Sequence, residues 1–118
     1  AIMGDASAPQ ASLYELETAL RHGIPVLVIV LNNSQYAGYE SSYPYTMHVT
    51  PSSVMSHAKV AEALGAWSER VEKPDEIVPA LRRAEKEMRS GRPALLEVIT
   101  APVPKYGSWG RRGLSYGG

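Results

Sequence analysis

The chain has 118 residues, enough for one domain of ordinary size, and 44% of them are apolar, enough to build a core. Its 12 basic and 12 acidic residues cancel and form no basic stripe, which argues against nucleic-acid binding. There is no cysteine, which excludes a disulfide framework, a thiolate metal site and a cysteine nucleophile. Because no apolar run approaches the roughly 20 residues of a membrane span and none has the form of a signal peptide, we expect a cytoplasmic protein with no membrane contact.

The first part of the chain predicts a strand, a helix and a second strand. Residues 1–3 have the composition of the end of a strand. Ser12 and Glu15 have the spacing of a capping box, which predicts a helix beginning at Ser12. Its apolar stripe would consist of Leu13, Leu16, Ala19 and Leu20, and Gly23 would end it. Residues 26–31 are apolar throughout, which predicts a parallel strand buried on both faces.

A long loop at residues 33–53 precedes two further helix–strand units, whose elements we place at 56–64, 67–71, 75–89 and 94–99. Asp75 is expected to cap the second of these helices, whose buried face would consist of Ile77, Ala80, Leu81, Ala84 and Met88. This order predicts an α/β fold, a doubly wound parallel sheet with helices on both faces. Because the chain begins within a strand, we expect the domain to be incomplete at its N-terminus and the chain to be part of a larger protein or assembly.

Two short polar motifs follow the first two predicted strands. One is Gly-Asp-Ala-Ser at residues 4–7, and the other is Asn32-Asn33. Because the carboxyl ends of parallel strands meet at one edge of a sheet, we expect both motifs to lie at that edge. A carboxylate and an amide oxygen suit Mg²⁺, which proteins usually hold together with a phosphate. Ordinary turn chemistry is the alternative interpretation of both motifs.

This pairing resembles the diphosphate-binding domain of thiamine-diphosphate enzymes, which carries Gly-Asp-Gly, a spacer of about two dozen residues and Asn-Asn. Residues 16–25, 58–66 and 92–98 also resemble segments of that family, in particular of its acetolactate-synthase-like branch. We therefore assign residues 1–103 to this domain and residues 104–118 to a tail rich in glycine and aromatic residues.

The resemblance implies that thiamine diphosphate and Mg²⁺ bind at this edge. The metal ligands would be Asp5, the side-chain oxygen of Asn33 and the backbone carbonyl of Gln35, while Asn32 would brace the loop. The diphosphate would be bound by backbone N–H groups of Gly4, Ala6 and Ser7. The hydroxyl of Ser7 would also contact it. The dipole of the helix predicted to begin near Ser12 would add to this attraction.

Ala6 departs from the family pattern, which usually has glycine at this position. If the backbone needs a positive φ there, alanine is strained; if it needs only a close approach to the diphosphate, a methyl group is tolerated. One alternative is therefore a non-catalytic relative that has lost the cofactor. Under that alternative, Ala6→Gly would raise cofactor affinity strongly.

Two other groups of residues have weaker interpretations. The loop tyrosines suit either a lid over the cofactor or a subunit interface, and they are Tyr36, Tyr39, Tyr43 and Tyr45. The histidines have no metal-binding spacing, and we expect none of them in the site: His22, His48 and His57.

The resemblance implies a domain that anchors Mg²⁺ and the diphosphate in an enzyme acting on 2-keto acids or related carbonyl substrates. The reaction would cleave or form a C–C bond, as in decarboxylases, synthases and lyases. In this family a glutamate from a separate pyrimidine-binding domain activates the cofactor, and active sites form between subunits. We therefore expect no catalytic residue in this chain, no activity of the chain alone, and a homodimer or homotetramer that includes a pyrimidine-binding domain or subunit. The remaining alternative is an unrelated flavodoxin-like phosphate-binding module.

Overall fold

The computed structural model describes residues 1–11, 13–34 and 55–101, in which four parallel strands form one sheet. The strand order is β1-β2-β4-β3, so β2 and β4 lie at the centre. The strands are β1 (Ile2–Gly4), β2 (Leu27–Asn32), β3 (Trp67–Val71) and β4 (Ala94–Ile99). Their order and direction confirm the predicted α/β fold with a parallel sheet.

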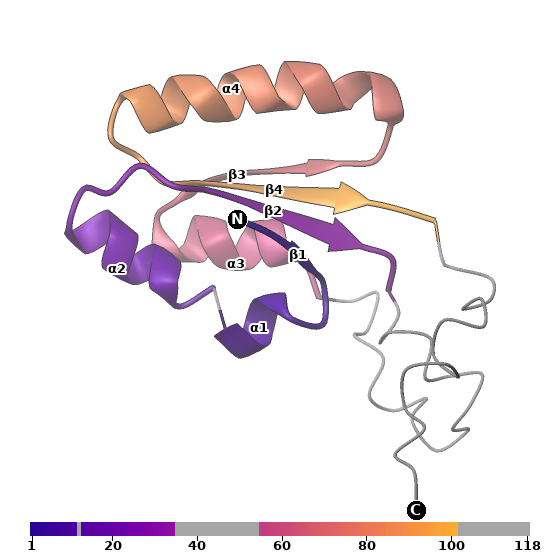
Figure 1. Ribbon diagram of the computed structural model, residues 1–118, viewed down its shortest axis with the longest axis horizontal. Coiled ribbons are helices and arrows are strands. Elements are labelled where there is room, and N and C mark those ends of the chain that lie inside the picture. The colour runs from indigo at the N-terminus through magenta and orange to yellow at the C-terminus, as the bar shows by residue number, and fades with distance from the viewer. Residues whose placement is uncertain (12, 35–54, 102–118) are drawn as a thin grey trace, which may run out of the picture.

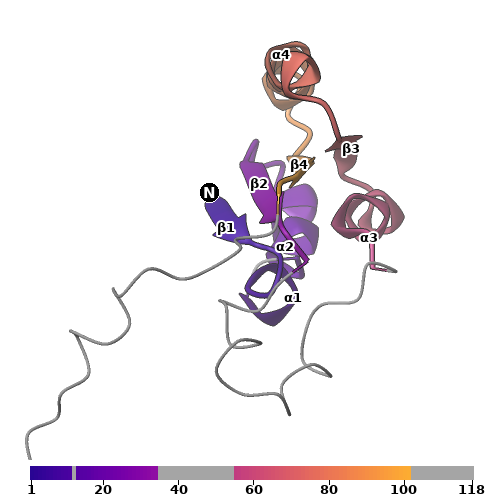
Figure 2. The same ribbon diagram turned by 90° about the vertical axis from the view of Figure 1, so that its right-hand side faces the viewer.

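Helices cover both faces of the sheet, as predicted (Figures 1 and 2). One face carries α4 (Ile77–Arg89), which follows the short 3₁₀ helix η3 (Pro74–Glu76). The other face carries the remaining helices, which are α1 (Ala8–Ala11), α2 (Glu15–Arg21) and α3 (His57–Leu64). Among the described residues, no helix has the length and apolar character needed to cross a membrane.

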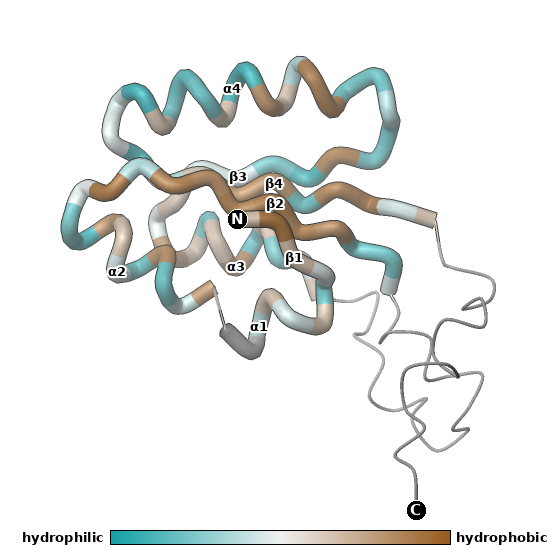
Figure 3. Tube along the Cα trace, viewed as in Figure 1, coloured by the Kyte–Doolittle hydropathy of each residue, from teal (hydrophilic) through white to brown (hydrophobic). Residues whose placement is uncertain are grey.

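The core has two layers because alternate side chains of each strand point to opposite faces. On the α2 and α3 side, Val30 and Leu95 are fully buried and belong to one cluster with Leu16. On the α4 side, Leu96 and Val98 pack with small residues of the helix, chiefly Ala80 and Ala84. Figure 3 shows that β1, β2 and β4 are largely hydrophobic, whereas hydrophilic and hydrophobic residues alternate along the helices. The predicted buried faces of α2 and α4 are thus confirmed.

The predicted capping box at Ser12 is wrong. The helix α2 begins at Glu15, so this residue opens the helix and does not lie at its third position. The N-cap residue is Tyr14, whose side chain makes no capping hydrogen bond. The chain turns here because α1 comes first and both Ala8 and Leu13 are buried in the same core cluster. Packing of these two residues, and not a local cap, fixes where α2 starts.

The predicted cap at Asp75 is also wrong. Asp75 lies inside η3, and the N-cap of α4 is Glu76, without a side-chain capping bond. Pro74 explains the difference, because its fixed φ suits the first position of a helical turn and starts the turn before Asp75. By contrast, the predicted end of α3 is confirmed, since Gly65 follows it with a left-handed φ of 102°.

The strand β2 is fully buried on one face and only partly buried on the other, so the prediction of burial on both faces holds only in part. Val28, Val30 and Asn32 are buried, whereas Leu31 is 43% exposed. Leu27 and Ile29 pack against the cluster that contains Ala80 and Ala84 of α4, whereas Leu31 does not belong to this cluster.

Candidate functional site

The carboxyl ends of three strands meet at one edge of the sheet. The backbone N–H of Asp5 donates to Leu31 O at 3.2 Å, which ties the end of β1 to β2. The backbone N–H of Thr100 donates to Asn32 O at 2.8 Å, which ties the end of β4 to β2. This edge faces the viewer in Figure 2. The structure therefore brings Asp5 and Asn33 to the same edge, as their motifs predict.

Asp5 is a buried carboxylate at this edge, with 2% of its surface exposed. Its Oδ2 atom is buried and accepts no hydrogen bond from any residue that the structure describes. Burial raises the pKa of Asp5, while the backbone N–H groups of Asp5 and Ala6 oppose this rise, as does the nearby His57. An unpartnered carboxylate oxygen is costly in such a place. A bound cation would satisfy it.

The Gly4–Ser7 turn leads directly from β1 into α1. The N–H of Ser7 donates to Gly4 O at 3.1 Å, and α1 begins at the next residue, Ala8. The nearest helix start is thus Ala8, four residues earlier than the expected start near Ser12. In the described part of the chain, Ser34 is the one residue other than glycine with a positive φ. Ala6 is therefore not in the left-handed region, and backbone strain gives no reason to require glycine at this position.

Asn32 braces the loop after β2, as predicted. Its Oδ1 atom accepts hydrogen bonds from Ser34 N at 3.0 Å and from Ser34 Oγ at 3.3 Å. Its Nδ2 atom donates to Glu97 Oε1 at 2.8 Å. Asn33 lies between these two anchored residues and is half-buried. Gln35, the third expected metal ligand, lies outside the described residues.

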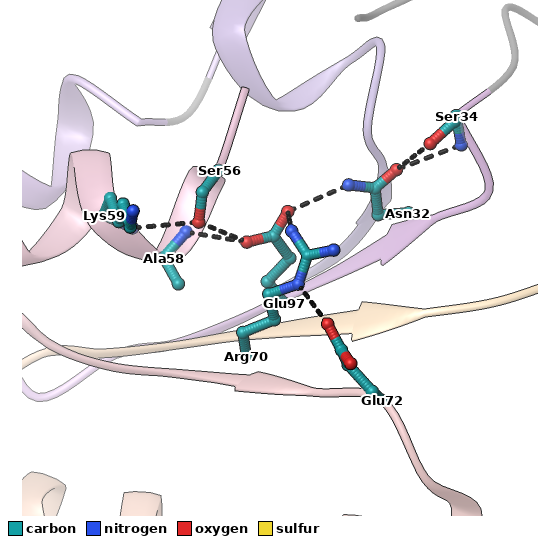
Figure 4. Close-up of polar contacts among 8 residues, drawn as sticks. All are labelled: Asn32, Ser34, Ser56, Ala58, Lys59, Arg70, Glu72 and Glu97. Atoms are coloured by element: carbon teal, nitrogen blue, oxygen red, sulfur yellow. Dashed lines mark hydrogen bonds and ion pairs between the residues drawn. The ribbon is translucent and has the colours of Figure 1, made fainter. Parts of the chain in front are cut away.

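Glu97 is a site residue that the sequence analysis missed. It is fully buried on β4, on the same face as Leu95. Its Oε2 atom accepts hydrogen bonds from Ser56 Oγ at 2.9 Å and from Ala58 N at 3.1 Å, both at the start of α3 (Figure 4). The available signal was a single acidic residue inside the apolar run 94–99. A charge in a buried strand needs partners, and those partners lie in distant parts of the chain.

A partly exposed arginine adds positive charge near this carboxylate. Arg70 Nη1 lies 3.8 Å from Glu97 Oε1, while Arg70 Nε donates to Glu72 Oε1 at 2.9 Å (Figure 4).

Burial alone would raise the pKa of Glu97. The hydrogen bonds from Ala58 N, Asn32 and Ser56 outweigh burial and lower this pKa below its ordinary value. Glu97 is therefore an ionised acceptor within its network.

We expect Glu97 to make stability depend on acid pH. Because its pKa is lower in the folded state, its stabilising effect is present above the ordinary value of 4.5 and is lost as the pH falls through the folded-state pKa. At neutral pH, Glu97→Gln should lower the free energy of unfolding by about 1–3 kcal/mol. Urea unfolding of both proteins from pH 7 downwards should show this difference shrinking below pH 4.5. A difference that stays constant, or grows, in acid would contradict this role.

His57 is a second buried polar residue that the sequence analysis did not place in the site. It is the first residue of α3 and is 1% exposed. Its Nδ1 atom has no hydrogen-bond partner in the described ranges, and the residue is near enough to Asp5 to lower the pKa of that carboxyl group. His22, by contrast, lies at the end of α2 as the C-cap residue. The other residues discussed above lie outside the described residues: His48, the four loop tyrosines and the 104–118 tail.

Within residues 1–11, 13–34 and 55–101, no three His, Asp or Glu side chains gather as a metal-binding group. A cation beside Asp5 would therefore need amide or backbone oxygens as further ligands. This donor set is the one that Mg²⁺ accepts, because it prefers oxygen ligands and uses few carboxylates.

Comparisons with known proteins agree with this geometry. The family model described as thiamine pyrophosphate enzyme, C-terminal TPP binding domain, matches residues 1–98. The mitochondrial acetolactate synthase catalytic subunit of Aspergillus candidus is 38% identical over 107 residues, which are 84% of this chain and 14% of that protein. A 2-hydroxyacyl-CoA lyase of Oryza sativa is 36% identical over 100 residues, which are 77% of this chain and 17% of the lyase.

A solved structure has the same fold. The thiamine diphosphate-dependent 4-hydroxybenzoylformate decarboxylase of Rhodococcus jostii superposes with a TM-score of 0.67 at 24% identity. The match covers 88% of this chain and 20% of the decarboxylase. This chain thus spans less than a quarter of the length of each of these three proteins. The family match excludes an unrelated flavodoxin-like module, and the chain belongs to the thiamine pyrophosphate enzymes, as a C-terminal TPP binding domain of the acetolactate-synthase-like branch.

Proposed function

We propose that this chain anchors the diphosphate of thiamine diphosphate, together with Mg²⁺, in an enzyme that acts on 2-keto acids or related carbonyl compounds. The observation that carries the proposal is the buried Asp5 Oδ2 atom, which has no partner among the described residues. A carboxylate oxygen needs a partner, which can be water or a metal ion. Because burial excludes water from this oxygen, a metal ion is the partner that we propose.

Different residues of the chain would bind the metal ion and the diphosphate. Asp5, the side-chain oxygen of Asn33 and the backbone carbonyl of Gln35 would hold Mg²⁺. The Gly4–Ser7 turn would bind the diphosphate through Gly4, Ala6 and the hydroxyl of Ser7, because the N–H of Ser7 already donates to Gly4 O. The positions of Asp5 and Asn33 at one sheet edge support this assignment. When bound, thiamine diphosphate supplies a nucleophilic carbon and an electron sink for C–C bond chemistry.

The reaction and its partners belong to the whole protein. The relatives named above include a synthase, a lyase and a decarboxylase, which supports C–C bond cleavage or formation as the reaction class. We infer that a pyrimidine-binding domain or subunit supplies the activating glutamate within a homodimer or homotetramer. The 118-residue chain alone is therefore expected to bind the cofactor without turning over substrate. We place the enzyme in the cytoplasm.

Calorimetric titration of the chain tests this function. Thiamine diphosphate should bind when Mg²⁺ is present, and binding should be lost when the metal is chelated. Thiamine without its diphosphate is the matched control and should not bind under either condition, because the proposed contacts involve only the metal and the diphosphate. Equal binding with and without Mg²⁺, or no binding at all, would overturn the proposal.

A further inference from the structure

Glu97 contacts the chain on both sides of residues 35–54. Before that segment, Asn32 Nδ2 donates to Glu97 Oε1 at 2.8 Å. After it, Ser56 Oγ and Ala58 N donate to Glu97 Oε2. One buried carboxylate on β4 thus connects the end of β2 with the start of α3 (Figure 4). No step of the proposed cofactor binding uses this carboxylate directly.

The bond to Glu97 fixes the orientation of the Asn32 amide. Because Glu97 Oε1 accepts from Nδ2, the amide oxygen Oδ1 points the other way, where it accepts from Ser34 N and Oγ. Ser34 has a φ of 55°, a left-handed conformation that is unfavourable for a residue other than glycine. The hydrogen bonds from Ser34 to Asn32 offset this cost. These hydrogen bonds close the turn that contains Asn33 on both sides.

We propose that Glu97 is a positioning residue for Asn33, acting through the oriented amide of Asn32 and the turn that closes on Ser34. The inference rests on the proposed function, because Asn33 is there an Mg²⁺ ligand. Glu97 itself would touch neither the metal nor the cofactor. Its effect would be to keep the Asn33 turn in its binding conformation before the metal arrives, which removes an ordering cost from binding.

A carboxylate is needed here because the hydrogen-bonding neighbours of Glu97 are all donors. Asn32 Nδ2, Ser56 Oγ and Ala58 N all donate, and an ionised carboxylate accepts at both oxygens. In Glu97→Gln, one of the two oxygens becomes an NH₂ group. If the remaining oxygen serves Ser56 and Ala58, the new NH₂ group meets Asn32 Nδ2, donor against donor. The Asn32 amide could turn over to accept, but its NH₂ group would then face Ser34 N.

This reasoning predicts that a reciprocal exchange restores the network. In Asn32→Asp combined with Glu97→Gln, the new carboxylate at position 32 would accept from both the new amide at position 97 and Ser34 N. Each single variant should weaken Mg²⁺-dependent thiamine diphosphate binding by about 10–100-fold, the usual effect of losing a residue that orients a metal ligand. The double variant should recover most of this loss. If Glu97→Gln does not fold, Asn32→Ala breaks the same link and leaves the α3 contacts of Glu97 intact.

Two readouts separate this role from a merely structural one. Amide hydrogen exchange at Ser34, measured without metal or cofactor, should accelerate in each single variant and slow again in the double variant. Ser56→Ala is the matched control, because it removes a different donor to Glu97, on the α3 side. This control should lower the free energy of unfolding while leaving the Ser34 exchange rate and Mg²⁺-dependent affinity within about threefold of the wild type.

The outcomes distinguish this inference from the proposed function. Wild-type affinity and unchanged Ser34 exchange in folded Glu97→Gln would overturn the positioning role, as would a double variant no better than the single ones. If the wild-type chain fails to bind Mg²⁺ and thiamine diphosphate, the proposed function fails. The Ser34 exchange rates still decide in that case whether Glu97 sets the turn.

Discussion

Replacing Asp5 by asparagine should abolish Mg²⁺-dependent binding of thiamine diphosphate and should stabilise the metal-free chain. The affinity should fall by more than about 100-fold, because even residues that only orient metal ligands contribute about 10–100-fold. The expected gain in stability has a separate cause. Asp5 is 2% exposed and one of its oxygens has no partner in the described part of the chain, so burial disfavours its charged form. Calorimetric titration and urea unfolding of the same samples would measure both effects.

A matched control distinguishes a ligand from a general loss of negative charge. Glu62 lies exposed on α3, and Glu62→Gln makes the same acid-to-amide change away from the edge where β1 and β2 end. It should leave both cofactor affinity and stability nearly unchanged, within about 0.5 kcal/mol. If Asp5→Asn kept wild-type affinity, Asp5 would not be the metal ligand. If it also destabilised the metal-free chain, the buried carboxylate would be satisfied by a partner and not poised for a cation.

The pKa values of the two buried carboxylates, Asp5 and Glu97, are shifted in opposite directions. Asp5 and Glu97 are both buried, and burial alone would raise the pKa of each. At Glu97 the surrounding donors outweigh burial, whereas at Asp5 they do not. Glu97 is thus satisfied within the protein, while Asp5 retains an oxygen that an external cation would satisfy. This contrast supports the two roles proposed above, a residue that positions a turn and one that binds a cation.

The position of the candidate site residues at one sheet edge was predictable because it depends on local pattern. A polar residue that directly follows a parallel strand lies at the carboxyl edge, so Asp5 and Asn33 could be placed there from the sequence alone. The strands β3 and β4 were predicted with the correct bounds for a related reason, since a short run bounded by glycine and proline leaves little choice of length.

The errors concern features that depend on tertiary contacts. The start of α2 is set by the burial of Ala8 and Leu13, which no capping pattern reveals. The exposure of Leu31 depends on which residues of β2 pack against the cluster that contains Ala80 and Ala84 of α4. Glu97 was missed because its hydrogen-bond partners are separated from it by 65 residues in the case of Asn32 and 39 in the case of Ala58. Helix propensity and motif spacing describe only residues that are close in the sequence. They could not predict these features because the contacts join segments that are distant in the sequence.

Replacing Leu95 by alanine should have the largest effect on stability. Leu95 is fully buried on the central strand β4, in the cluster that joins the sheet to α2 and α3. Its loss should lower the free energy of unfolding by about 2–5 kcal/mol, through lost apolar burial and the cavity left behind. Urea unfolding followed by circular dichroism would measure the change. At a typical domain stability of about 5–15 kcal/mol, the variant would remain folded only by a reduced margin.

Leu31→Ala is the matched control, because it makes the same chemical change on the adjacent central strand. Leu31 is 43% exposed, so the change should cost less than about 1 kcal/mol. Equal costs for the two variants would contradict the exposure of Leu31. The comparison also bears on function, since Leu95 and Glu97 lie two residues apart on one face of β4. If Leu95→Ala destabilises the chain while its folded fraction keeps Mg²⁺-dependent affinity, the apolar core supports the sheet and the hydrogen bonds of Glu97 separately fix the turn that contains Asn33.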